Sequence, residues 1–171
     1  MAEHHGGITI KGNPLTLVGE HVEVGSPAPD AALVDNGLGT VNISDMSGSV
    51  RLLSVVPSLD TGICHAQTKR FNDEALNYEG VNFLTVSAEH PFNQKRWVAN
   101  EACSNINVVS DHMSMGFGDA YGLTIKEWRL LQRAVIIIDE DDNVAYAEYC
   151  PEVAQFPDYD AALAALKEVV G

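Results

Sequence analysis

Positive charge, long apolar runs and cysteine are all scarce in this sequence. Lysine and arginine number 10 against 24 aspartates and glutamates, which gives a formal net charge of −14. A surface this acidic repels the phosphates of nucleic acids and of anionic lipids, so neither is an expected partner. Apolar runs such as residues 134–138 are far too short to span a bilayer, so we expect no membrane segment.

Targeting signals are missing as well. Residues 1–7 contain neither a basic nor an apolar stretch, so they do not resemble a signal peptide. The three cysteines are an odd number, which fits a reducing compartment better than a disulfide framework. We therefore expect a cytoplasmic protein. A length of 171 residues suits one domain, and the prediction is a single domain over residues 1–171.

Short apolar segments separated by turn residues fill the first 43 positions. A Gly-Asn-Pro turn at 12–14 lies between two such segments and predicts a small β-hairpin near the N-terminus. The Asn-Gly pair at 36–37 is typical of a hairpin turn, here between strands expected at 32–34 and 40–43.

From residue 51 onward, apolar runs typical of strands alternate with segments of helical periodicity. We expect strands at 52–56, 81–86, 108–109, 134–138 and 144–149. We expect helices at 62–78, 92–102 and 161–170. Alternating strands and helices that end in a β-hairpin and a helix predict an α/β sandwich around a mixed sheet.

Cys64 stands where an expected strand gives way to an expected helix. Pro57 stops the strand, and the helix is expected to begin near Thr61, which places Cys64 in its first turn. Free backbone N–H groups and the positive end of the helix dipole favour a thiolate there. Such a cysteine can have a pKa below the value of about 8.5 for a free thiol. Cys64 is therefore the candidate nucleophile.

Thr61, three residues before Cys64, is open to two interpretations. On a helix this spacing brings its hydroxyl beside the sulfur, where it can donate to a thiolate or orient a bound oxygen. Alternatively, Thr61 is only an N-cap whose Oγ accepts from the Cys64 N–H, and Cys64 is a small apolar residue on one stripe with Phe71 and Ala75. The residues alone leave both interpretations open.

The residues around Cys64 also resemble a known family. The segment Pro-Ser-x-Asp-Thr-x-x-Cys at 57–64, with Lys-Arg-Phe-Asn at 69–72, closely resembles the bacterial thiol peroxidase branch of the peroxiredoxins. Matching segments at 91–97, 133–135 and 157–162 extend the resemblance over nearly the whole chain. The resemblance implies a thioredoxin-like fold, a three-layer α/β sandwich with a mixed central sheet and an N-terminal hairpin.

The resemblance implies an activity and four site residues. The expected reaction is reduction of hydrogen peroxide and organic hydroperoxides, with electrons from thioredoxin or a similar thiol and without a metal or organic cofactor. Cys64 matches the peroxidatic cysteine, which becomes a sulfenic acid, and Thr61 matches its hydroxyl partner. Pro57 matches the proline that shields the sulfur, and Arg133 matches the arginine that stabilises the thiolate and the peroxide. The family commonly forms homodimers, so a homodimer is expected.

One position departs from the family. Most relatives of this branch carry a resolving cysteine directly after the aromatic residue that matches Trp97, and here that position is Val98. Cys103 lies five residues further on, which on a continuous helix means a rise of about 7.5 Å and a face turned by about 140°. Three interpretations stay open: Cys103 is a relocated resolving cysteine, an external thiol resolves Cys64, or Val98 is an engineered substitution that blocks the disulfide.

Other functions and sites carry weaker signals. A thiol–disulfide oxidoreductase would need a second cysteine where Thr61 stands. A redox-sensing binding module that uses Cys64 oxidation only as a signal stays an alternative, as does a one-cysteine peroxidase. The six histidines form no metal-ligand pattern with a cysteine, so no metal site is expected. Cys150 is interpreted as a structural thiol.

Overall fold

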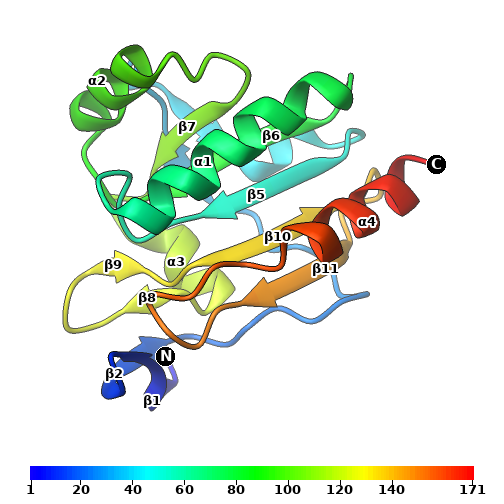
Figure 1. Ribbon diagram of the computed structural model, residues 1–171. Helices are drawn as coiled ribbons and strands as arrows, with labels where there is room; N and C mark the ends of the chain where they lie inside the picture. The colour runs from blue at the N-terminus through cyan, green and yellow to red at the C-terminus, as the bar shows by residue number, and fades with distance from the viewer.

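The computed structural model describes residues 1–171, which form two β-sheets and four α-helices (Figure 1). The larger sheet has seven strands in the order β11-β10-β5-β6-β7-β3-β4, and the smaller has the order β1-β2-β8-β9. The strands of the larger sheet are β3 (Ala32–Val34), β4 (Thr40–Asn42), β5 (Arg51–Val55), β6 (Asn82–Ser87), β7 (Asn107–Ser110), β10 (Ala134–Ile138) and β11 (Val144–Tyr149). The helices are α1 (Gly62–Glu74), α2 (Pro91–Glu101), α3 (Gly116–Tyr121) and α4 (Tyr159–Val170).

The larger sheet is mixed. Strands β5, β6 and β7 run parallel, whereas β10 lies antiparallel to β5 and β11 lies antiparallel to β10. Strands β5 and β10 are buried along their whole lengths, as expected of central strands covered on both faces. The mixed sheet predicted from the sequence is therefore confirmed.

Alternate side chains of β10 show how the sheet separates two apolar layers. Val135 and Ile137 join a cluster with residues of α1, α2 and α4, whereas Ala134, Ile136 and Ile138 join a cluster with α3. This alternation follows from the two-residue period of a β-strand. In Figure 1, α1 and α4 accordingly lie in front of the sheet and α3 lies behind it.

The N-terminal hairpin belongs to the smaller sheet. Its two strands, β1 (Glu3–Ile10) and β2 (Asn13–Val18), continue through β8 (Thr124–Ile125) into β9 (Leu130–Leu131). The backbone of Thr9 donates to Pro151 O over 2.9 Å and accepts from Val153 N over 2.9 Å. The hairpin thereby fixes the segment after β11, which reaches the functional site.

Most predicted elements are present, with shifts of a residue or two at their ends, and the differences are local. The first helix ends at Glu74 rather than 78, and a 3₁₀ turn over Ala75–Asn77 follows it. The sequence did not predict α3, whose first N–H groups, at Phe117 and Gly118, donate to the buried carboxylate of Asp111 over 3.0 and 2.7 Å. Strands β8 and β9 were also missed, because two residues are too few to show a period.

None of the helices combines the length and the apolar character that crossing a membrane would require.

Candidate active site

Cys64 occupies the first turn of α1, as the sequence predicts. The helix begins after Thr61, whose extended backbone (φ −93°, ψ 151°) is typical of an N-cap residue. Its first helical hydrogen bond runs from His65 N to Thr61 O over 2.8 Å. The side chain of Cys64 is fully buried and lies in the apolar cluster between the sheet and the helices.

Arg133 reaches Cys64 from a distant part of the chain. It directly precedes β10, and because Ala134 pairs with Val55, it emerges beside the end of β5 from which the loop to α1 departs. Its Nη1 donates to Cys64 Sγ over 3.3 Å, and its Nη2 donates to Val153 O over 3.0 Å. The structure thus joins the two residues that the family resemblance pairs.

The charge of Arg133 has no carboxylate among its hydrogen-bond partners. The protein contains two arginines that are only 1% exposed, and the other one, Arg51, is paired with the carboxylate of Asp142. Buried charges are normally compensated by an opposite charge, because removing an ion from water is costly. Among the hydrogen-bond partners of Arg133, the group that can carry a negative charge is the sulfur of Cys64.

Gln67 orients the guanidinium, a role that sequence reasoning missed. Its side-chain oxygen accepts from Arg133 Nη1 over 3.0 Å, and its Nε2 donates to Ser54 Oγ over 2.9 Å. Because the Gln67 amide nitrogen donates to Ser54, the amide oxygen is the atom that faces Arg133 and accepts from it. A signal was present, because Gln67 is a polar residue three positions after Cys64 on the buried side of the helix.

Thr61 and Pro57 line a cavity of about 250 Å³ beside the buried pair. Arg133 lines the same cavity, whereas Cys64 is fully buried and is not part of the lining. The Thr61 hydroxyl donates weakly to Ser58 O over 3.4 Å and makes no hydrogen bond to the sulfur. It does not cap the helix either, so neither hydrogen bond expected from the sequence is present. A role of Thr61 in the reaction stays a prediction.

Cys103 follows the C-terminal end of α2. Ala102 ends the helix in the left-handed conformation (φ 54°), and the Cys103 side chain turns into the apolar cluster that also holds Cys64. Burial raises the pKa of the Cys103 thiol, against the opposing influence of the Lys69 ammonium. The end of α2 also contacts α1. Glu101 Oε2 lies 3.4 Å from His65 Nε2 and 3.8 Å from Lys69 Nζ. All three cysteines of the chain are free thiols.

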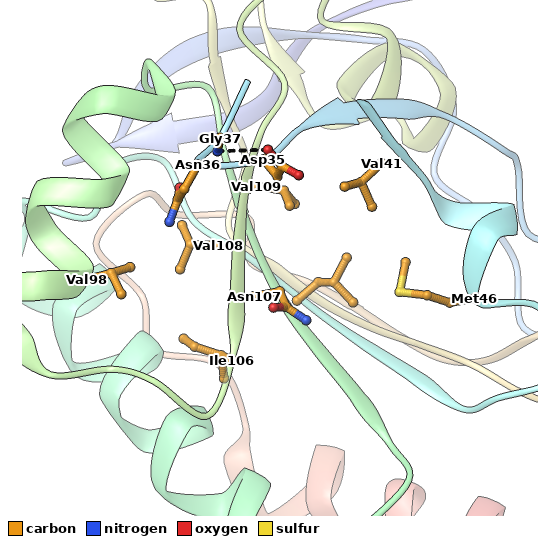
Figure 2. Close-up of a pocket in the computed structure, with 11 residues that line it drawn as sticks. Asp35, Asn36, Gly37, Val41, Met46, Val98, Ile106, Asn107, Val108 and Val109 are labelled. Atoms are coloured by element: carbon orange, nitrogen blue, oxygen red, sulfur yellow. Dashed lines mark hydrogen bonds between the residues drawn. The ribbon is translucent and has the colours of Figure 1, made fainter. Parts of the chain in front are cut away.

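Val98, by contrast, faces a second cavity (Figure 2). This cavity of about 450 Å³ lies between α2, β7 and the turn after β3, and most of its lining is apolar. No cysteine lines it. Val98 also packs against the apolar cluster that holds Cys64 and Cys103, so position 98 lies at the border between this cluster and the cavity.

Cys150 directly follows β11 and lies beside the backbone of Arg133. Its N–H donates to Arg133 O over 3.0 Å, and its own carbonyl accepts from Gln132 Nε2 over 2.9 Å. Burial raises the pKa of its thiol to about 11. A thiol that stays protonated at neutral pH is a poor nucleophile, so the structure favours a packing role for Cys150.

No cluster of three or more His, Cys, Asp or Glu side chains is arranged to hold a metal ion.

A cysteine at a helix start, in contact with a buried arginine, is an arrangement suited to redox chemistry on the sulfur. The fold and the site together define the class of cysteine-dependent peroxidases. Comparison with known proteins agrees. The Redoxin family model matches residues 23–163. The chain is 51% identical to a thiol peroxidase of Halalkalibacterium halodurans, over 94% of this chain and 96% of the relative. It is 47% identical to a thiol peroxidase of Bacillus subtilis, over 95% and 98%.

Solved structures show the same fold. A peroxiredoxin-like protein from Aquifex aeolicus superposes with a TM-score of 0.89 at 37% identity, over 97% of this chain and 99% of that one. A thiol peroxidase from Chromobacterium violaceum superposes with a TM-score of 0.84 at 21% identity, over 94% and 95%. The thioredoxin-like fold with a mixed sheet and an N-terminal hairpin is confirmed. The chain belongs to the Redoxin family and, within it, to the thiol peroxidases, which are peroxiredoxin enzymes acting on a peroxide with a thiol reductant.

Proposed function

We propose that this thiol peroxidase reduces hydrogen peroxide and small organic hydroperoxides through Cys64. The thiolate attacks one peroxide oxygen, the O–O bond breaks, and the other oxygen leaves as water or an alcohol after taking up a proton. Sulfur is oxidised to sulfenic acid, and the peroxide is reduced by two electrons. The observation that carries this proposal is the 3.3 Å contact between Cys64 Sγ and a buried arginine that no carboxylate neutralises.

Arg133 acts on both partners of this reaction. Its charge stabilises the thiolate, and its Nε, which is buried and has no protein partner, is a donor that remains for a peroxide oxygen. Negative charge develops on the leaving oxygen, and a preorganised guanidinium stabilises such charge without reorganising. Gln67 holds the guanidinium in the required orientation.

The cavity beside the pair is the proposed peroxide site. Pro57, Ile63 and Val153 supply apolar walls that limit water, and Thr61 is the one hydroxyl in the lining, placed to orient a bound oxygen. A volume of about 250 Å³ accommodates a small hydroperoxide. Because Cys64 is fully buried and does not line this cavity, a small movement of the loop or of the cysteine side chain precedes attack.

We further propose that Cys103 resolves the sulfenic acid. Its thiol condenses with the oxidised Cys64, releasing water and forming a disulfide, which thioredoxin or another dithiol then reduces. Both cysteines lie in one apolar cluster, Cys64 on α1 and Cys103 just after α2, and the end of α2 contacts α1 through Glu101. The raised pKa of the buried Cys103 thiol opposes this step until the end of α2 opens. The alternative is an enzyme that uses Cys64 alone and an external thiol, and the burial of Cys103 favours that route.

Intact mass after one equivalent of peroxide, with counting of free thiols, tests both proposals. Internal resolution predicts the loss of two thiols, mapped to Cys64 and Cys103, and a stable oxygen adduct on Cys64 in Cys103→Ser. Cys150→Ser is the matched control and leaves the disulfide unchanged. An adduct on Cys64 with Cys103 still free rejects internal resolution, and peroxide consumption that survives Cys64→Ser rejects the role of Cys64.

The remaining expectations concern the whole chain. We propose that residues 1–171 act as one domain, that the protein works in the cytoplasm, and that it forms a homodimer. The three free thiols support a reducing compartment. The exposed aromatic side chains of Phe92 and Trp128 offer apolar surface for association. Sedimentation equilibrium distinguishes the dimer from a monomer of 18.4 kDa.

A further inference from the structure

Glu89 is a half-buried acid close to the site that the mechanism does not use. It lies between β6 and α2, at the edge where the parallel strands β5 and β6 end. The loop from β5 to α1 leaves the sheet at that same edge. The location brings the carboxylate to the segment that carries the residues around Cys64.

The carboxylate of Glu89 binds this loop directly. Its Oε1 accepts from Leu59 N over 2.7 Å, and its Oε2 accepts from Ser58 Oγ over 3.1 Å. Ser58 and Leu59 stand between Pro57 and Thr61, which both line the proposed peroxide cavity. The Ser58 hydroxyl also accepts from Asp60 N over 3.2 Å, which continues the same hydrogen bonds toward the helix start.

Glu89 is itself firmly held. Its Oε1 also accepts from Ser87 Oγ over 3.0 Å, and its backbone carbonyl accepts from Ser110 Oγ. Gln94 of α2 donates to Ser87 Oγ over 2.9 Å and thereby ties α2 to the same group. None of the hydrogen-bond partners of the Glu89 carboxylate is a cation. The carboxylate accepts its hydrogen bonds from a backbone N–H group and from hydroxyl groups. A carboxylate bound in this way fixes geometry.

We propose that Glu89 is a positioning residue for the peroxidase reaction. It holds the loop 57–61 so that Pro57 and Thr61 line one cavity with Arg133, and so that the first turn of α1, which carries Cys64, keeps its place beside that cavity. The inference rests on Cys64 being the reacting cysteine. Reactivity depends steeply on such alignment, since a displacement of about 1 Å can cost on the order of a hundredfold in rate.

Two substitutions separate positioning from the effect of charge. Glu89→Gln removes the negative charge but keeps an oxygen that accepts from Leu59 N, whereas Glu89→Ala removes both. If the carboxylate acted only through its charge, both variants would favour the thiolate equally and would accelerate the reaction. Positioning predicts instead that the alanine variant is slow and that the glutamine variant is largely rescued. Glu79→Gln, at an exposed acid, is the matched control.

The experiment is single-turnover oxidation by hydrogen peroxide in a stopped-flow instrument, together with the pH dependence of iodoacetamide alkylation of Cys64. We expect the rate constant to fall about tenfold or more in Glu89→Ala and to stay within about threefold in Glu89→Gln. The alkylation profile of the alanine variant should move to higher pH. Equal rates in the two variants, or a folded Glu89→Ala that matches Glu79→Gln, would overturn the proposal.

Two further variants complete the test. If thermal unfolding shows that Glu89→Ala is not folded, Ser58→Ala keeps the Leu59 N contact, removes the Oε2 contact together with the bond from Asp60 N, and should slow oxidation about threefold. An unchanged rate in Ser58→Ala then overturns the proposal. Cys64→Ser is measured in parallel, and peroxidase activity that survives in this variant refutes the proposed function. If Cys64→Ser is inactive while Glu89→Ala is fully active, only the proposed role of Glu89 is refuted.

Discussion

The guanidinium of Arg133 lies 3.3 Å from the sulfur of Cys64, 69 positions away in the sequence. The contact arises because β10 lies antiparallel to β5, so that the residue before one strand meets the loop after the other. Both side chains are excluded from water. In this setting a cation and a thiolate stabilise each other strongly, because little solvent screens them. The structure therefore places the proposed nucleophile in direct contact with a buried cation.

Arg133→Lys should lower the rate of Cys64 oxidation on the order of a hundredfold, although the charge is retained. An ammonium cannot reach Cys64, Gln67 and Val153 together, because it lacks the planar fork of donors. The measurement is the second-order rate constant with hydrogen peroxide. Arg96→Lys, at an exposed position, is the control and should match the parent protein. A rate within twofold of the parent in Arg133→Lys would contradict the proposed role.

Gln67→Glu should slow oxidation more than Gln67→Ala does. Both variants lose the donor to Ser54 Oγ, which should cost about 1–2 kcal/mol of unfolding free energy. Only the glutamate places a carboxylate against Arg133, where it competes with the thiolate for the charge. Alkylation of Cys64 should therefore shift to higher pH in Gln67→Glu alone. Identical alkylation profiles in the two variants would show that Gln67 acts through packing only.

Val98→Cys in a Cys103→Ser background tests the departure from the family pattern. The family resemblance implies that position 98 is where a resolving thiol belongs, so peroxide should convert Cys64 and the introduced cysteine into a disulfide. Mass analysis after one equivalent of peroxide reads this directly. Val98→Ala in the same background cannot form the bond and is the control. A persistent oxygen adduct on Cys64 would mean that α2 does not open far enough toward α1.

Asp111 should make folding stability depend on pH in the acidic range. Burial raises the pKa of this carboxyl to about 6, although it accepts from two N–H groups of α3. The folded state thus binds the proton more tightly than the unfolded chain, and stability falls as pH rises from about 4 to about 6. This loss should be on the order of 1–3 kcal/mol and absent in Asp111→Asn. Urea unfolding of both proteins at pH 4, 5, 6 and 7 measures the difference, and parallel curves would refute it.

Local signals explain why so much of the fold was predictable. The buried run that becomes β5, its stop at Pro57 and the helix period from Gly62 onward are all encoded by neighbouring residues. These signals place Cys64 in a helical first turn without any knowledge of the remaining chain. The expected N-terminal hairpin and the β3–β4 hairpin likewise depend on turn residues within a few positions of their strands.

The same reasoning failed where the outcome depends on a partner far along the chain. Strands β8 and β9 exist because the N-terminal hairpin offers an edge to pair with, not because their two residues have a period. The hydroxyl of Thr61 points to Ser58 O rather than to the sulfur, which the spacing of three residues could not reveal. Glu89 was missed because its importance lies in a loop some 30 positions earlier.

By itself, then, the sequence determined the local setting of Cys64, the candidate nucleophile, since caps, turns and periodicity act over a few residues. The family resemblance added Arg133 as a residue to look for. Only the tertiary structure decided that its charge meets the sulfur, that Gln67 orients it and that no carboxylate neutralises it. These contacts depend on which strands pair and on which buried polar groups remain without an opposite charge. Both are decided only when the whole chain folds and both faces of the sheet are buried.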